Sequence, residues 1–154
     1  MTLWVALVVL VVFSAFFSAS ETAFSSLNQI RLKSRAEDGD TSAARVLEMA
    51  EKYDKLLSTI LIGNNIVNIA AASIGTILFT QMLGAERGAT MSTIVLTIIV
   101  LIFGEVTPKS LAKEMPETVA TAVAPALSLL MLVFTPLTWL FSQWKRFLGH
   151  FVHS

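Results

Sequence analysis

The chain has 154 residues, of which 55% are apolar and only 14% are charged, with a formal net charge of zero and a mean hydropathy of +0.72. A soluble domain carries about 25% charged residues, so this composition indicates a membrane protein of one domain. Zero net charge gives no indication of nucleic-acid binding, and the lack of cysteine excludes disulfides and thiolate metal sites.

The first apolar segment covers residues 3–27 and carries several serines and Glu21 in its second half. It could be read as a signal peptide, because an apolar stretch ends in Ser-Ala-Ser. However, it has no basic residues at its start and its apolar run is long. We therefore predict a first transmembrane helix.

A polar stretch follows at residues 28–55 and holds six basic residues. Basic loops stay on the cytoplasmic side of a membrane, so we predict a cytoplasmic helical hairpin with the N-terminus outside. Asp40 or Thr41 is placed to cap the second helix of this hairpin.

The second predicted span covers residues 56–83 and contains the sequence GNNIVN, Gly63 to Asn68. Carboxamides cost several kcal/mol, roughly, when they are buried in hydrocarbon without a partner, so these asparagines need an explanation. The sequence GAERGAT, Gly84 to Thr90, then predicts a short turn.

The third predicted span covers residues 91–108. Met91 to Phe103 alone is too short, since a span needs about 20 residues. Glu105 must therefore lie at membrane depth or at its inner edge. Gly104 and Pro108 flank it and predict a broken helix, in which Pro108 leaves the carbonyl of Gly104 without a donor.

The fourth apolar segment, residues 117–147, contains Pro125 and Pro136 and ends in Lys145 and Arg146. Basic residues also precede it, so a straight crossing would place one basic pair outside. We predict proline-kinked juxtamembrane helices on the cytoplasmic side, with a cytoplasmic C-terminus. A fourth full crossing is the alternative.

Three polar motifs interrupt the predicted spans: SASETAF in the first, GNNIVN in the second and GEVTPK in the third. Each has a structural explanation, because membrane serines often bond their own backbone and membrane asparagines often join helices. Glu105 is harder to explain in this way, since an acid at membrane depth marks function by default. Glu21 either pairs with Lys109 or acts as a second acidic ligand. Because the motifs can meet at one point of a bundle, they predict an oxygen-ligand site for a hard cation such as Mg²⁺.

The stretches SASETAFSSL, LIGNNIVNI and GEVTPKSLA resemble the transmembrane domain of the CorC/CorB and cyclin M family of Mg²⁺ transporters. The resemblance implies an all-α membrane protein with three transmembrane helices plus a kinked juxtamembrane helical belt, assembled as a homodimer in the plasma membrane, the inner membrane of a prokaryote. It implies Mg²⁺ export, with Na⁺ as a possible coupling ion. By resemblance, the metal ligands are Ser18, Asn65, Asn68, Gly104 and Glu105, with Ser14, Glu21 and Asn64 as second choices.

In that family a pair of cytosolic CBS domains follows the belt. None follows in this sequence, which suggests a shortened or minimal member, so regulation by ATP is not carried over. Two other functions stay open: a cation antiporter of the Na⁺/H⁺ type in which Glu105 exchanges a proton, and a non-transporting membrane anchor or Mg²⁺ sensor. An intramembrane serine hydrolase is disfavoured because no histidine lies in the predicted bundle, and we expect no enzymatic activity.

Overall fold

The computed structural model describes residues 2–153, with side chains to residue 152, and these residues are almost entirely helical. The all-α prediction is therefore confirmed. The helices are α1 Thr2–Ser25, α2 Gln29–Glu37, α3 Thr41–Glu51, α4 Tyr53–Leu83, α5 Ala85–Ile99, the π-helix η1 Val100–Val106, α6 Thr107–Glu114, α7 Pro116–Val133 and α8 Thr135–His153.

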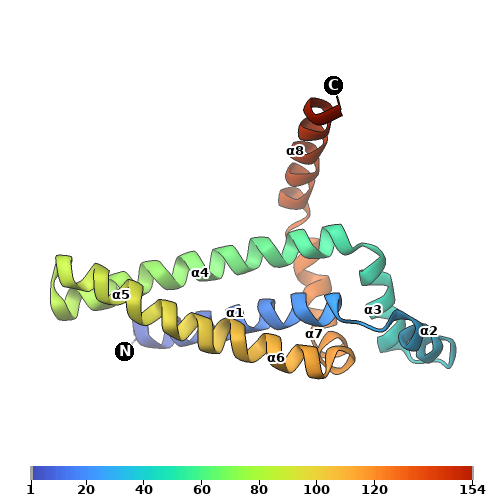
Figure 1. Cartoon of the computed structure of the whole chain (residues 1–154), viewed down its shortest axis with the longest axis horizontal. Helices are drawn as coiled ribbons and strands as arrows, with labels where there is room; N and C mark the ends of the chain where they lie inside the picture. The colour runs from blue at the N-terminus through green and yellow to red at the C-terminus, as the bar shows by residue number, and fades with distance from the viewer. Residues whose placement is uncertain (1, 154) are drawn as a thin grey trace.

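Three long helical elements form a bundle: α1, α4 and the continuous rod of α5, η1 and α6 (Figure 1). The rod covers 30 residues, Ala85–Glu114, so at about 1.5 Å per residue it reaches about 45 Å. The bundle has two distinguishable ends. We call the end at Gly84, where α4 turns into α5, the turn end, and the end at α2 and α3 the hairpin end.

The turn after α4 is much shorter than the sequence predicts. Gly84 alone reverses the chain, with φ of 88°, and α5 begins at Ala85. The predicted loop to Thr90 is therefore wrong. The tight reversal is possible because Gly88 has no side chain: a Cβ there would lie 2.6 Å from the Thr80 backbone. Glycine at φ near +90° avoids the strain that other residues would meet.

The predicted break in the third span is also different in the structure. The helix stays continuous and widens into η1, where the Thr107 N–H bonds the Ile102 carbonyl five residues back. π-helical turns are found mostly as local insertions within α-helices, frequently at functional sites. The helical rod therefore extends beyond the predicted 91–108 at both ends.

Four helical segments within residues 2–153 are long and apolar enough to cross a membrane: α1, α4, the α5–η1–α6 rod and α7. Length and composition thus leave the number of crossings open. In Figure 1, however, α7 runs across the other three near the hairpin end instead of alongside them, and α8 projects away from the bundle. The structure therefore distinguishes α7 and α8 from the three parallel elements.

Proline affects these two helices unequally. Pro125 lies inside α7, which continues past it, so no helix ends at this proline. The chain does change direction at Phe134, just before Pro136 in the first turn of α8. The first turn of a helix tolerates proline because its N–H would have no partner there.

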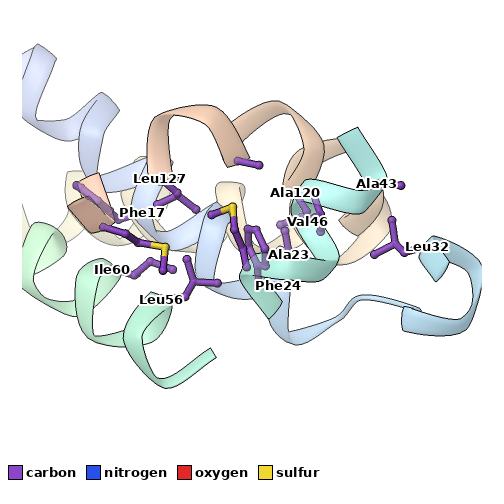
Figure 2. Close-up of a cluster of buried hydrophobic side chains, with 14 of the residues drawn as sticks. Phe17, Ala23, Phe24, Leu32, Ala43, Val46, Leu56, Ile60, Ala120 and Leu127 are labelled. Atoms are coloured by element: carbon purple, nitrogen blue, oxygen red, sulfur yellow. The ribbon is translucent and has the colours of Figure 1, made fainter. Parts of the chain in front are cut away.

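Most buried apolar side chains gather at the hairpin end (Figure 2). We call this group the hairpin-end cluster, and it consists of Phe17, Ala23, Phe24, Leu32, Ala43, Val46, Met49, Leu56, Ile60, Val67, Ala112, Ala120, Ala124, Leu127 and Met131. A smaller turn-end cluster consists of Leu7, Ala71, Leu78 and Leu96. The hairpin and α7 are thus packed into one core with the ends of α1 and α4.

Polar contacts join the same elements. Of the two cap candidates, Asp40 and Thr41, the structure selects Asp40, which accepts a hydrogen bond from the Ala43 N–H at 3.2 Å. Arg35 bonds Asp40 at 2.7 Å and reaches Glu117, in the first turn of α7, at 3.4 Å. Arg31 lies 3.7 Å from the same Glu117 carboxylate. The two ion pairs of Glu117 connect α2 with α7.

Candidate functional site

Polar or small residues from all three predicted spans meet within the bundle. The Ser14 hydroxyl of α1 donates a hydrogen bond to Oδ1 of Asn68 in α4, at 2.9 Å. The same Ser14 oxygen lies 2.9 Å from the position that a Cβ of Gly104, in η1, would occupy. GNNIVN and GEVTPK thus each contribute a residue to this contact, whereas the first span contributes Ser14, one turn before SASETAF.

Gly104 makes this approach possible because it has no side chain, and it is buried. Pro108 lies four residues after it and has no N–H, so the Gly104 carbonyl cannot receive the usual helical hydrogen bond from that position. The backbone of a widened helical turn thus approaches the Ser14 hydroxyl closely at Gly104.

The asparagines of GNNIVN face different ways. Asn64 and Asn68, four residues apart, share a side of α4, and both are partly buried. Asn65 is turned by about 100° from Asn64 and is exposed on the surface of the single chain. Among the three asparagines, Asn65 is therefore the one that faces away from the Ser14–Asn68 contact.

Oδ1 of Asn64 is buried and has no hydrogen-bond partner among the described residues. Buried polar atoms in proteins are nearly always bonded, and an exception needs a cause such as a bound ion. Asn64 lies one helical turn from the Ser14–Asn68 pair, so an additional acceptor oxygen is directed to the same part of the bundle.

The remaining candidate ligands are Ser18, Glu105 and Glu21. Ser18 lies one turn after Ser14 on α1, is 3% exposed, and its hydroxyl has no hydrogen bond to residues 2–152. Glu105 is partly exposed and forms no ion pair with the described part of the chain. Glu21 and Lys109 likewise form no ion pair with each other there, so the structure does not show that alternative.

Within the described residues, no three histidine, cysteine, aspartate or glutamate side chains cluster in a way that could hold a metal. An ion bound near Ser14, Asn68 and Gly104 would have a single carboxylate ligand. Its other protein ligands would be carboxamide, hydroxyl and carbonyl oxygens. Such a ligand set suits a hard cation, with water completing the coordination. The metal ligands proposed from the sequence remain a prediction.

The family resemblance places Asn65 ahead of Ser14 and Asn64 as a ligand, whereas the geometry favours Ser14 and Asn64. The rotation of α4 accounts for this: a Cβ on Gly63 would lie 2.3 Å from the Phe17 ring. Gly63 is therefore a point at which α4 closely approaches α1, and Asn64, the next residue, is partly buried. In the sequence, the signal for this rotation of α4 is Gly63, which directly precedes the asparagines.

Comparisons with known proteins show what the chain is similar to. The family model described as the cyclin M transmembrane N-terminal domain matches residues 5–152. The UPF0053 inner membrane protein YfjD of Escherichia coli is 44% identical over 135 residues, which cover 88% of this chain and 31% of that protein. A UPF0053 protein of Haemophilus influenzae is 38% identical over 151 residues, covering 98% of this chain and 36% of the relative.

A protein of Salmonella typhimurium named polyamine export protein is 32% identical over 145 residues, covering 86% of this chain and 32% of that protein. The chain thus spans about a third of the length of the curated relatives it matches.

Proposed function

The chain belongs to the cyclin M transmembrane N-terminal domain family, and from this premise we propose that it forms the membrane domain of a Mg²⁺ transporter. It is a multi-pass membrane protein. The proposed ion site lies where α1, α4 and η1 meet. Transport is proposed to be export, with Na⁺ as the coupling ion.

The buried, unbonded Oδ1 of Asn64 is the observation that carries the proposal. With Ser14 and Asn68 it supplies acceptor oxygens from two helices. Ser18, the Gly104 carbonyl and the Glu105 carboxylate complete a set close to the six oxygens that Mg²⁺ prefers. Because only one ligand is charged, the site would hold Mg²⁺ weakly enough to release it, as transport requires.

We further propose three crossings and a belt at the cytoplasmic surface. The position of α7 across the bundle supports this, since its buried side chains pack on the hairpin (Figure 2). Cysteines introduced at Ser34 and Gly149 should then react with a membrane-impermeant reagent from the same side. Reaction from opposite sides would favour a fourth crossing by α7. The native chain has no cysteine to complicate the test.

A homodimer is part of the same proposal. Ile66 and Ile69, neighbours of Asn65 on α4, are 53% and 68% exposed in the single chain, and a second copy would cover such a face. Ile69→Cys should form a disulfide-linked dimer under oxidation, whereas Ile30→Cys, exposed on α2, should not. Equal cross-linking of both variants would indicate random collision.

Export of a polyamine is the second candidate, because relatives named polyamine export protein match 86% and 88% of this chain. Carboxylate and amide oxygens can also accept hydrogen bonds from ammonium groups. The two candidates differ in geometry: Mg²⁺ needs six converging oxygens, whereas an extended polyamine needs acceptors spaced along a path.

The test measures binding and flux of both cations with the whole chain. Calorimetry with Mg²⁺ and with spermidine compares wild type with Glu105→Gln, and with Glu114→Gln as a matched control at the exposed end of α6. We expect Mg²⁺ binding that Glu105→Gln abolishes and Glu114→Gln preserves. Binding of spermidine alone would support the polyamine candidate.

Flux into proteoliposomes separates transport from the other functions. Mg²⁺ flux that depends on a Na⁺ gradient supports the proposed exporter. Mg²⁺ binding without flux would support a membrane anchor or Mg²⁺ sensor. Proton release in exchange for Na⁺ would support the antiporter of the Na⁺/H⁺ type.

A further inference from the structure

A cavity of about 430 Å³ lies between the start of α4 and α8. Lys52 and Lys55 line it from the α4 side and Lys145 lines it from α8. Asp54 is the one carboxylate among the described lining residues, so three positive charges face one negative charge. None of the three ammonium groups has an ion-pair partner within residues 2–152. Folding thus brings unpaired positive charges from distant parts of the sequence to one cavity.

The first turn of α4 adds to the attraction for an anion. Lys52 is the N-cap residue of α4, and no side chain caps this end. The first N–H groups of a helix lack intrahelical acceptors and carry a partial positive charge. The hydroxyls of Ser58 and Ser142 also line the cavity. Ammonium groups, N–H groups and hydroxyls are the donors that bind a phosphate.

A neighbouring cavity of about 330 Å³ shares Lys52 and Lys55 with the first. It adds Arg45 and one acid, Glu48, and is walled on its other side by apolar residues that include Leu132. The two cavities together carry four basic side chains and two acidic ones. The positive charge therefore extends along a groove that also has an apolar wall.

The position of α8 relates this groove to the membrane. Its polar side, with Thr138, Ser142 and Lys145, lines the cavity. Its other side carries large apolar side chains that are all exposed: Leu137, Leu140, Phe141, Trp144 and Leu148. A helix with one large apolar side and a basic polar side lies in the membrane interface. The cavity then lies at the level of the lipid headgroups, where Trp139, 62% exposed at its rim, is also favoured.

We propose that this cavity binds the phosphate of an anionic phospholipid headgroup, with Lys52, Lys55 and Lys145 as its ligands. A lipid fits better than a free phosphate because apolar surface of α8 lies directly beside the charged groove. The bound headgroup would bridge the start of α4 and α8, which otherwise share few contacts. The site lies apart from the ion layer at Ser14 and does not depend on the proposed transport.

Native mass spectrometry of the detergent-solubilised chain tests this proposal. The chain is titrated with phosphatidylglycerol, with phosphatidylcholine as the zwitterionic comparison, and with soluble glycerol phosphate. The cavity variant is Lys52→Gln/Lys55→Gln/Lys145→Gln. The matched control is Lys33→Gln/Lys113→Gln/Arg146→Gln, which removes equal charge from exposed residues that do not line the cavity. Thermal melting verifies that both variants fold.

We expect phosphatidylglycerol to bind wild type more tightly than phosphatidylcholine. A lysine near anionic lipid contributes about fivefold in affinity, so the cavity variant should bind phosphatidylglycerol roughly a hundredfold more weakly while the control stays close to wild type. Equal loss in both variants would overturn the proposal, because diffuse charge would explain the binding. No preference for phosphatidylglycerol would also overturn it. Glycerol phosphate that binds as tightly as the lipid would indicate a site for free phosphate instead.

Discussion

At the turn end of the bundle, α4 and α5 approach each other through glycines, whereas at the hairpin end a large apolar cluster joins α1, α2, α3, α4, α6 and α7. Gly88 lies against the Thr80 backbone, and Gly75 lies against Leu96 and Ser92. Close contact through small residues is typical of helices surrounded by lipid. The hairpin-end cluster includes residues of the polar helices α2 and α3, and in this it resembles the core of a soluble domain.

The two ends are therefore stabilised in different ways. In lipid, burying apolar side chains gains little because the surrounding chains are equally apolar, so tight packing holds the turn end. At the hairpin end, apolar surface is removed from water, and the hydrophobic effect contributes. Along α1, Ser14 lies between Leu7 of the turn-end cluster and Phe17 of the hairpin-end cluster. The polar layer of Ser14, Asn64, Asn68 and Gly104 is thus found between the two ends.

Truncation in the hairpin-end cluster should have the largest effect on stability. Leu127 is fully buried in α7, and a buried Leu→Ala change costs about 2–5 kcal/mol. We expect Leu127→Ala to lower the free energy of unfolding by this amount in denaturant titrations. Leu129→Ala on the same helix, where Leu129 is 63% exposed, is the control. Equal losses would mean that α7 is not held by this core.

Adding a methyl group at the turn end should have the next largest effect. A Cβ at Gly88 meets backbone atoms that cannot rotate away, and overpacking costs about 1–3 kcal/mol. Gly88→Ala should therefore lower the melting temperature. Gly149→Ala, where nothing lies within 4 Å, should instead be neutral or slightly stabilising, since alanine is the better helix former. If both changes are neutral, close helix packing does not hold the turn end.

The asparagines should respond according to the way they face. Asn68→Ala removes the hydrogen bond with Ser14 and should cost about 0.6 kcal/mol, up to about 1.7. Asn64→Ala removes an unbonded buried oxygen, so without Mg²⁺ it should leave stability unchanged or raise it.

The same variants test the ion site by calorimetry. We expect both Asn64→Ala and Asn68→Ala to weaken Mg²⁺ binding, while the exposed Asn65→Ala keeps it. Loss of Mg²⁺ binding in Asn65→Ala alone would contradict this assignment and restore Asn65 as the ligand.

The ion pairs between α2 and α7 should contribute less. Glu117→Gln keeps the shape of the side chain but removes the charge that faces Arg31 and Arg35. Partly exposed pairs contribute about 0.2–1 kcal/mol, and salt should reduce the difference. Melting curves at low and high ionic strength test this, with Glu37→Gln, which has no ion pair in the described chain, as the control.

The smallest effect should come from the cap of α3. The hydrogen bond from the Ala43 N–H and, to a smaller extent, the one from the Arg35 side chain hold the pKa of Asp40 below its ordinary value. A lowered pKa in the folded state contributes stability at neutral pH, which is lost as the pH falls through that pKa. The melting temperature of wild type should therefore fall slightly more than that of Asp40→Asn below about pH 4. Asp38→Asn, two residues before the cap, is the control and should behave like wild type.

The sequence by itself determined the membrane class, the helical content, a helix cap at Asp40 or Thr41 and the positions of the three polar motifs. These features are local: hydropathy, helix caps and unusual polar residues are written in short stretches of chain. The convergence of the motifs could also be predicted, because three spans with one polar patch each bury those patches best by facing one another.

Only the tertiary structure decided which polar atoms meet. The contact between Gly63 and Phe17 sets the rotation of α4 about its axis, and this turns Asn64 inward and Asn65 outward. The close approach of Gly88 to Thr80 shortens the turn to Gly84. In each case residues distant in sequence decide the outcome, and a rotation of about 100° per residue along a helix makes neighbouring side chains face different surroundings.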